Sequence, residues 1–97
     1  MYSVDEFVDY YTIAYKVRKE SNFWLIYFQD LGNYYATNEI GKDILQYFTA
    51  ASQKTLFQYL VDLYGDLNDN QLQEIEKFLF KLKDNSILKR RHSNEKI

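Results

Sequence analysis

The chain has 97 residues, a formal net charge of −2 at pH 7 and no cysteine, and 46% of its residues are hydrophobic and 27% charged. This size allows one domain with one hydrophobic core and leaves too little chain for a large catalytic cleft. The composition excludes a disordered chain, the charge argues against a general nucleic-acid binder, and the missing cysteines exclude disulfides and thiolate metal sites.

The first half of the sequence predicts a lead-in segment followed by three strands. Residues 1–11 fit a short helix or a strand, and we expect a helical or irregular lead-in that packs on the sheet. Residues 12–19 alternate apolar and polar side chains, which predicts a strand with one solvent-exposed face. Residues 23–29 are apolar on both faces, as in a central strand covered on both sides. Residues 33–37 form the third strand, and short turns predict an antiparallel meander.

The second half predicts three helices, because the hydrophobic period changes from two to about 3.6 residues after the third strand. Each begins at a residue whose side chain can accept a hydrogen bond from the free first turn. The helices are expected over residues 38–48, 55–64 and 68–85, with caps at Asn38, Thr55 and Asn68. These elements predict an α+β fold, a three-stranded antiparallel sheet followed by three helices, and look like a winged helix-turn-helix. The folded domain would cover residues 12–88, and residues 89–97 would form a basic flexible tail.

The third strand, residues 33–37, is rich in Tyr and is expected to be the open edge of the sheet. An open edge offers unpaired N–H and C=O groups to another chain. We therefore expect a protein that holds a peptide and does not transform a molecule.

The sequence offers no catalytic constellation. His92 is the one His of the chain and falls in the predicted tail, without a pocket or an orienting partner. Asp66, Asn68 and Asn70 imitate the start of a calcium-binding loop, but Gln71 stands where that loop needs Gly. We expect no enzyme activity, no cofactor and no metal. The start of the chain lacks a signal-peptide pattern and no run approaches roughly 18 apolar residues, so we expect a cytoplasmic protein without membrane contact.

The strand-to-helix junction is similar to that of the PqqD-like family, the precursor-peptide recognition elements of ribosomally made, modified peptides (RiPPs). In that family an aromatic strand leads into an Asn-Glu pair and a short apolar helix ending in Ile-Leu. The matching positions here are Tyr34, Tyr35, Asn38, Glu39, Ile44 and Leu45. The family's third-helix pattern is matched by Glu74, Ile75, Phe78, Leu79 and Leu82. Two positions depart from the family: Glu74 replaces the usual Asp, and Ser86 replaces the closing Gly. The resemblance covers about residues 13–88.

The resemblance implies a stand-alone protein that binds the leader segment of a precursor peptide and delivers it to a modifying enzyme or a leader peptidase. Radical-SAM, lasso-peptide and cyclodehydratase pathways are all compatible. In the family the leader adds as an extra strand beside the third strand, in a groove closed by the third helix. The implied peptide-binding residues are Tyr34, Tyr35, Ala36, Glu74, Phe78, Lys81 and Leu82.

Some of these residues have a purely structural alternative. Phe78 and Leu82 could belong to the core, and Glu74 could be a surface acid paired with Lys77. Phe80 lies off the apolar stripe of the third helix and is expected either to be an exposed contact for a partner or to pack under the N-terminal segment. That stripe consists of Leu72, Ile75, Phe78, Leu79 and Leu82.

Two other functions stay open. A winged-helix DNA-binding regulator has the right helix order, but its third helix would present only a weak basic face. A small dimeric module would pair the open sheet edges of two copies, so a monomer or a weak homodimer is expected.

Overall fold

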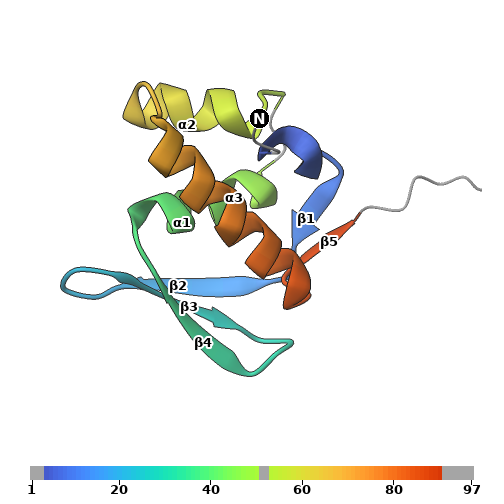
Figure 1. Cartoon of the computed structure of the whole chain (residues 1–97). Helices are drawn as coiled ribbons and strands as arrows, with labels where there is room; N and C mark the ends of the chain where they lie inside the picture. Colours follow the sequence, from blue (N-terminus) through green and yellow to red (C-terminus); the bar gives the residue numbers. More distant parts are fainter. Residues whose placement is uncertain (1–3, 51–52, 91–97) are drawn as a thin grey trace, which may run out of the picture.

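The computed structural model describes residues 4–50 and 53–90. In these ranges the chain forms an α+β fold in which the helices lie on one side of a three-stranded sheet (Figure 1). The elements are η1 (Val4–Phe7), β1 (Tyr10–Thr12), β2 (Tyr15–Lys19), β3 (Trp24–Phe28), β4 (Asn33–Thr37), α1 (Glu39–Thr49), α2 (Leu56–Tyr64), α3 (Asp69–Asp84) and β5 (Leu88–Arg90). Within the described residues, none of the helices has the length and the hydrophobicity that crossing a bilayer requires.

The main sheet is an antiparallel meander in the order β2-β3-β4, which confirms the predicted three-stranded sheet. At one end of the sheet Trp24 pairs with both Lys19 and Thr37. The turn from β3 to β4 ends at Gly32, whose φ of 66° lies in the left-handed region that glycine adopts without a steric cost.

A second, two-stranded sheet was not predicted. The expected strand over residues 12–19 is divided: Thr12 ends β1, which pairs with β5, and Tyr15 begins β2. Between the two strands the backbone N–H of buried Ile13 donates a hydrogen bond to Ile87 O at 3.0 Å. Lys89 and Arg90, expected in a flexible tail, belong to β5 instead. The rest of the predicted tail, residues 91–97 with His92, lies outside the described residues.

The lead-in segment, which was expected to pack on the sheet, packs on the helices. Its 3-10 helix η1 contacts α2 and α3. Phe7 is buried, and its ring lies edge-on to Phe80 at 5.4 Å between centroids. Phe80 therefore packs under the N-terminal segment, as one of the two alternatives predicted.

The predicted helix caps are confirmed. Asn38 accepts the Gly41 N–H at 2.9 Å, and Thr55 accepts the Gln58 N–H at 3.1 Å. Asn68 and Gln71 exchange side-chain and backbone hydrogen bonds in a capping box. These bonds fix where each helix begins, because the first-turn N–H groups have no partner within the helix.

The C-terminus of α3 closes in a left-handed turn at Ser86. Ser86 has a φ of 63°, and its N–H donates to Lys83 O at 3.0 Å. The next N–H, from Ile87, donates to Leu82 O at 2.9 Å, so the two bonds form a Schellman motif. Ser thus occupies a backbone conformation that favours Gly.

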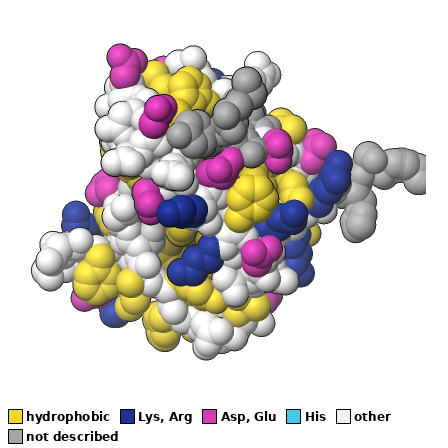
Figure 2. All heavy atoms as spheres, viewed as in Figure 1, with side chains coloured by type: hydrophobic (Ala, Val, Ile, Leu, Met, Phe, Trp, Pro, Cys, Tyr) yellow, Lys and Arg dark blue, Asp and Glu magenta, His cyan; other side chains and the backbone are white. Residues whose placement is uncertain are grey.

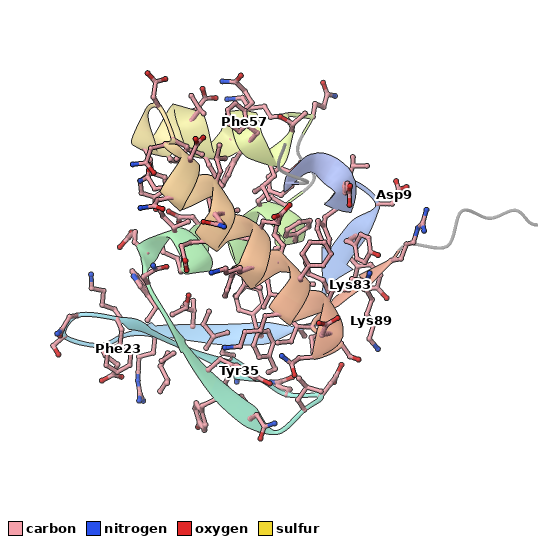
Figure 3. All side chains as sticks on the ribbon, in the orientation of Figure 1. Asp9, Phe23, Tyr35, Phe57, Lys83 and Lys89 are labelled. Atoms are coloured by element: carbon pink, nitrogen blue, oxygen red, sulfur yellow. The ribbon has the colours of Figure 1, made fainter. Side chains whose placement is uncertain are left out.

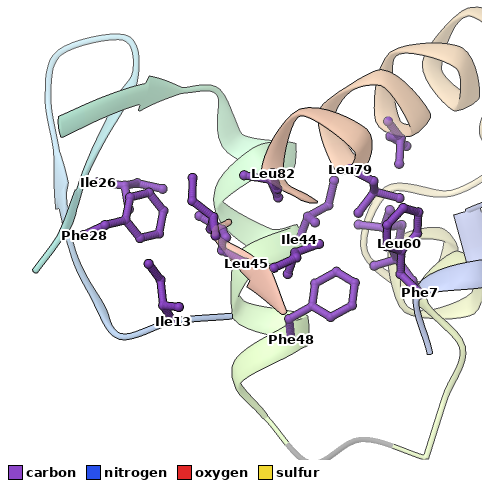
Figure 4. Packing of buried hydrophobic residues seen from close by; sticks show 14 residues of the cluster. Phe7, Ile13, Ile26, Phe28, Ile44, Leu45, Phe48, Leu60, Leu79 and Leu82 are labelled. Atoms are coloured by element: carbon purple, nitrogen blue, oxygen red, sulfur yellow. The ribbon is translucent and has the colours of Figure 1, made fainter. Parts of the chain in front are cut away.

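The hydrophobic core lies between one face of the main sheet and the three helices (Figure 4). Ile26 and Phe28 of β3 contribute the sheet side and are both 1% exposed. The helices contribute Ile44, Leu45, Phe48, Leu60, Leu79 and Leu82.

The other face of the sheet is not covered by a second layer of described elements, so the prediction of a strand buried on both sides was wrong (Figure 1). Leu25 and Tyr27 lie on this outer face and are only half-buried.

Candidate functional site

The main sheet has two edge strands, β2 and β4, and they differ in charge. Within the described residues β4 pairs with β3 alone, and β2 likewise. The β2 edge carries Lys16, Arg18 and Lys19, which is a common protection against unwanted strand pairing. The sequence of β4, Asn-Tyr-Tyr-Ala-Thr, carries no charge. Of the two edges, β4 is therefore the one that presents unpaired backbone groups without charged side chains on the same strand.

A groove of about 590 Å³ borders the β4 edge and lies between the end of β4, the start of α1 and residues 70–81 of α3. We call it the β4–α3 groove. Its lining combines an apolar floor with a polar rim. The lining residues are Ala36, Thr37, Asn38, Ile40, Gly41, Ile44, Asn70, Gln71, Glu74, Ile75, Phe78 and Lys81.

A smaller cavity of about 30 Å³ continues from the groove toward the C-terminal end of α3. It shares Ala36, Thr37, Phe78 and Lys81 with the groove and adds Tyr35 and Leu82. Tyr35, labelled in Figure 3, packs its ring edge-on against Phe28 at 5.4 Å. The two cavities together follow β4 along α3.

The groove depends on a close approach between β4 and α1 at Gly41. A Cβ on Gly41 would lie 1.8 Å from Thr37 Oγ1 and 3.2 Å from Phe78 Cζ. Only glycine allows α1 to turn away from β4 at this distance, so Gly41 sets the width of the groove at this end.

The first turn of α1 is fixed to β3 by a polar contact. The indole Nε1 of Trp24 donates to Glu39 Oε1 at 3.2 Å, and Lys42 lies 4.7 Å from the centre of the Trp24 ring. Two hydrogen bonds hold the pKa of the Glu39 carboxyl below its usual value. The bond from the Trp24 indole has the larger effect and the bond from Lys42 the smaller. The hydrogen bond to Asp43 raises the pKa of Lys42, which stays a cation beside the ring.

A buried acid holds the next turn of α1 against α2. Asp43 is 7% exposed and accepts hydrogen bonds from Lys42 Nζ, at 2.7 Å, and from the Tyr64 hydroxyl. Burial, and then the bond to Asp43, raise the pKa of Tyr64 well above its usual value. Asp43 thus has the partners that a buried carboxylate requires.

Six of the seven residues expected at the site line the two cavities. Ala36, Glu74, Phe78 and Lys81 line the groove, and Tyr35 and Leu82 line the smaller cavity. Leu82 is only 4% exposed and is part of the core, as its structural alternative predicted. Glu74 also makes the expected pair with Lys77, with Nζ and Oε2 3.6 Å apart.

Tyr34 is the exception, because it lies on the outer face of the sheet. Successive side chains of a strand point to opposite faces, and Tyr35 points to the core face. The Tyr34 ring is 65% exposed and contacts Tyr27 with the centroids 4.8 Å apart. The period-two alternation in residues 33–37 was the sequence signal that separates Tyr34 from Tyr35.

Sequence reasoning missed the contribution of α1 to the groove. Ile40, Gly41 and Ile44 line it from this helix. Ile40 and Ile44 stand four residues apart, on one face of α1. Their position directly after the Asn38 cap was the available signal, because the first turn of a helix lies next to the strand that leads into it.

The charges on α3 are arranged along the groove. Glu74 stands toward the N-terminal half of the helix and Lys81 lies one further turn beyond Phe78. Lys81 makes no ion pair with another described residue. Figure 2 shows Lys and Arg side chains in the middle of this face with hydrophobic side chains between them.

The groove combines several kinds of contact group. Within residues 4–50 and 53–90, no three His, Cys, Asp or Glu side chains are grouped so that they could hold a metal ion. The groove instead offers backbone hydrogen-bonding groups, an apolar floor and two opposite charges. An extended peptide uses all of these features. Comparison of the chain with protein-family models, with curated proteins and with solved structures finds no match.

Proposed function

We propose that the protein binds the leader segment of a ribosomally made precursor peptide as an added strand on β4, within the β4–α3 groove. The single observation that carries this proposal is the edge strand β4, which has no charged side chain and lies beside a groove with an apolar floor. Strand addition of this kind gains affinity from main-chain hydrogen bonds and specificity from side-chain pockets.

Magnitudes explain why the groove is needed as well as the edge. A main-chain hydrogen bond contributes about 0.5–1.5 kcal/mol net, whereas ordering one peptide residue costs about 1–2 kcal/mol. Edge pairing alone therefore does not hold a flexible leader. Burial of apolar side chains, at roughly 25 cal/mol per Å², must supply the difference, and the half-buried side chains of Ile40 and Phe78 form the surface for it.

The nature of the peptide rests on the resemblance to the PqqD-like family. That resemblance implies a winged helix-turn-helix whose leader lies beside the third strand and the third helix. Here these elements are β4 and α3. The bound leader would present the rest of the precursor to a modifying enzyme or a leader peptidase, so the protein itself has no catalytic role in this account.

The test uses peptides selected from a random-sequence display library against the whole chain. Tyr35→Pro and Ala36→Pro each remove one backbone N–H, and adjacent strand residues direct their N–H groups to opposite sides. One variant should keep the sheet, as checked by circular dichroism, because its N–H does not pair with β3.

That folded variant should bind the selected peptides at least tenfold more weakly than the wild type. Unchanged affinity in the folded proline variant would overturn strand addition at β4. If the folded variant does bind more weakly, a short precursor reading frame encoded beside a maturation enzyme would connect the bound peptide to a pathway.

A homodimer that pairs two β4 edges is the second candidate, and the same uncharged edge favours it. Sedimentation distinguishes this dimer from a monomer that binds a peptide. A concentration-dependent dimer that the folded proline variant cannot form would support edge-to-edge pairing, and a monomer across concentrations would retire it.

A further inference from the structure

The inference concerns the order of charges that the β4–α3 groove selects in its occupant, and it rests on the proposed function. Glu74, Phe78 and Lys81 stand at positions i, i+4 and i+7 of α3, so they share one face of the helix. All three line the groove. The face therefore presents an acid, an aromatic ring and a base in that order along the helix.

Both charges are accessible to a ligand. The Glu74 side chain is 75% exposed, and its one ion pair among the described residues is with the exposed Lys77, an interaction of the kind that contributes little to stability. Lys81 is exposed and makes no ion pair among the described residues. A carboxylate on the occupant thus gains a partner at Lys81 without breaking an existing pair.

The direction of β4 relative to α3 follows from the cavity linings. Asn38, after the end of β4, lines the groove together with Asn70 near the start of α3. Tyr35, two residues before the end of β4, lines the smaller cavity together with Leu82 near the end of α3. The strand and the helix therefore run in opposite directions along the groove (Figure 1).

The direction of the occupant then follows from the sheet. All pairs in the main sheet are antiparallel, and antiparallel pairing is slightly more stable per residue than parallel pairing. A strand added antiparallel to β4 runs in the same direction as α3. Its N-terminal part lies beside Glu74 and its C-terminal part beside Lys81.

The spacing of the charges also matches an extended chain. The seven residue steps from Glu74 to Lys81 rise about 10 Å along the helix. Side chains at i, i+2 and i+4 of a strand share one face and span about 13–14 Å. The long side chains of Glu and Lys bridge this difference.

We infer that the groove selects a segment of the form basic–x–apolar–x–acidic, read from the N-terminus. The basic residue meets Glu74, the apolar residue packs on Phe78, and the acidic residue meets Lys81. The reverse order, acidic before basic, places like charges together at both ends and binds more weakly.

The test is a pair of selections from one library of random 12-residue peptides displayed on their own mRNA. The targets are the wild type and Glu74→Lys/Lys81→Glu, which reverses the charge order and keeps the net charge. Glu76→Lys/Lys83→Glu is the matched control, because it makes the same exchange at the same spacing with both positions outside the β4–α3 groove. Circular dichroism and urea unfolding establish that all three proteins are folded.

The wild type and the control should enrich peptides with the basic residue before the acidic one, and the groove variant should enrich the opposite order. Two synthetic peptides of one composition and opposite charge order should differ about threefold to tenfold in affinity for the wild type. That preference should shrink as salt screens the charges. The groove variant should invert it.

Two results would overturn the inference, and they are distinguishable. Selected peptides without a charge order, or with an order that the groove variant leaves unchanged, would refute charge selection while peptide binding stands. Recovery of no β4-dependent peptide by any target would refute the proposed function itself and the inference with it.

Discussion

Thr37 and Gly41 approach each other so closely that a Cβ on Gly41 would lie 1.8 Å from Thr37 Oγ1 and 3.0 Å from Thr37 Cβ. Strand β4, which offers its edge, and helix α1, which forms part of the groove, thus meet at a contact that leaves no room for a side chain at position 41.

The first prediction is that Gly41→Ala destabilises the fold. Alanine favours a helix by up to about 1 kcal/mol over glycine, but the clash with Thr37 forces β4 and α1 apart and should outweigh this gain by about 1–3 kcal/mol. Urea unfolding measures the change. Adding Thr37→Ala removes the nearest atom and should restore part of the loss. A Gly41→Ala variant more stable than the wild type would contradict the account.

The second prediction is that Ser86→Gly stabilises the protein. Ser86 holds a φ of 63°, which costs a residue with a Cβ about 1–2 kcal/mol, and glycine avoids this cost at some loss of chain entropy. We expect a gain of about 0.5–1 kcal/mol in thermal or urea unfolding. Asn85→Gly is the control, because the φ of Asn85 is −92° and glycine brings no relief there. Equal effects at both positions would argue against a left-handed Ser86.

The third prediction concerns alkaline pH. The pKa of Tyr64 is raised in the folded state by burial and by its hydrogen bond to Asp43. Above the unfolded pKa of about 10, the unfolded chain loses this proton first. The contribution of Tyr64 is therefore fully present below about pH 10 and is lost as the pH rises through its folded pKa.

Unfolding free energies measured from pH 8 to 11.5 should fall at the alkaline end. Tyr64→Phe should flatten this decline in part, since the raised pKa of Lys42 acts in the same direction. Tyr34→Phe, at an exposed position, is the control. A decline of equal slope in the wild type and in Tyr64→Phe would contradict the role of the Tyr64 hydroxyl.

The fourth prediction separates the two sides of the sheet. Phe78→Ala should weaken peptide binding at least tenfold, because the ring lines both cavities beside β4. Tyr34→Ala should leave affinity within about twofold, since Tyr34 lies on the outer face with Tyr27. Because Phe78 is half-buried, its variant must be shown to fold. A larger loss from Tyr34→Ala than from Phe78→Ala would place the peptide on the wrong face for this account.

Local physical signals explain how much of the fold was predictable. Asn38, Thr55 and Asn68 begin the helices because their side chains accept first-turn N–H bonds, which is a matter of neighbouring residues. The pairing of β1 with β5 was not predictable in this way. It joins Thr12 to Leu88, and nothing local to either short strand indicates its partner.

The candidate site was predictable to the extent that it depends on periodicity. Glu74, Phe78 and Lys81 follow the helical repeat and do line one groove. Tyr34 lies apart from the groove because side chains of a strand alternate between two faces, so a Tyr-rich strand presents Tyr on both of them. The close approach at Gly41 required the packing of three elements and had no sequence signal beyond the glycine itself.

The most direct test of the central claim is amide hydrogen exchange, followed by NMR, with and without a saturating selected peptide. We predict that alternate amides within Asn33–Thr37 gain protection on binding, while the amides of Tyr15–Lys19 on the opposite edge do not change. Protection that appears on β2, or a bound peptide that leaves every amide of β4 exchanging as before, would contradict it.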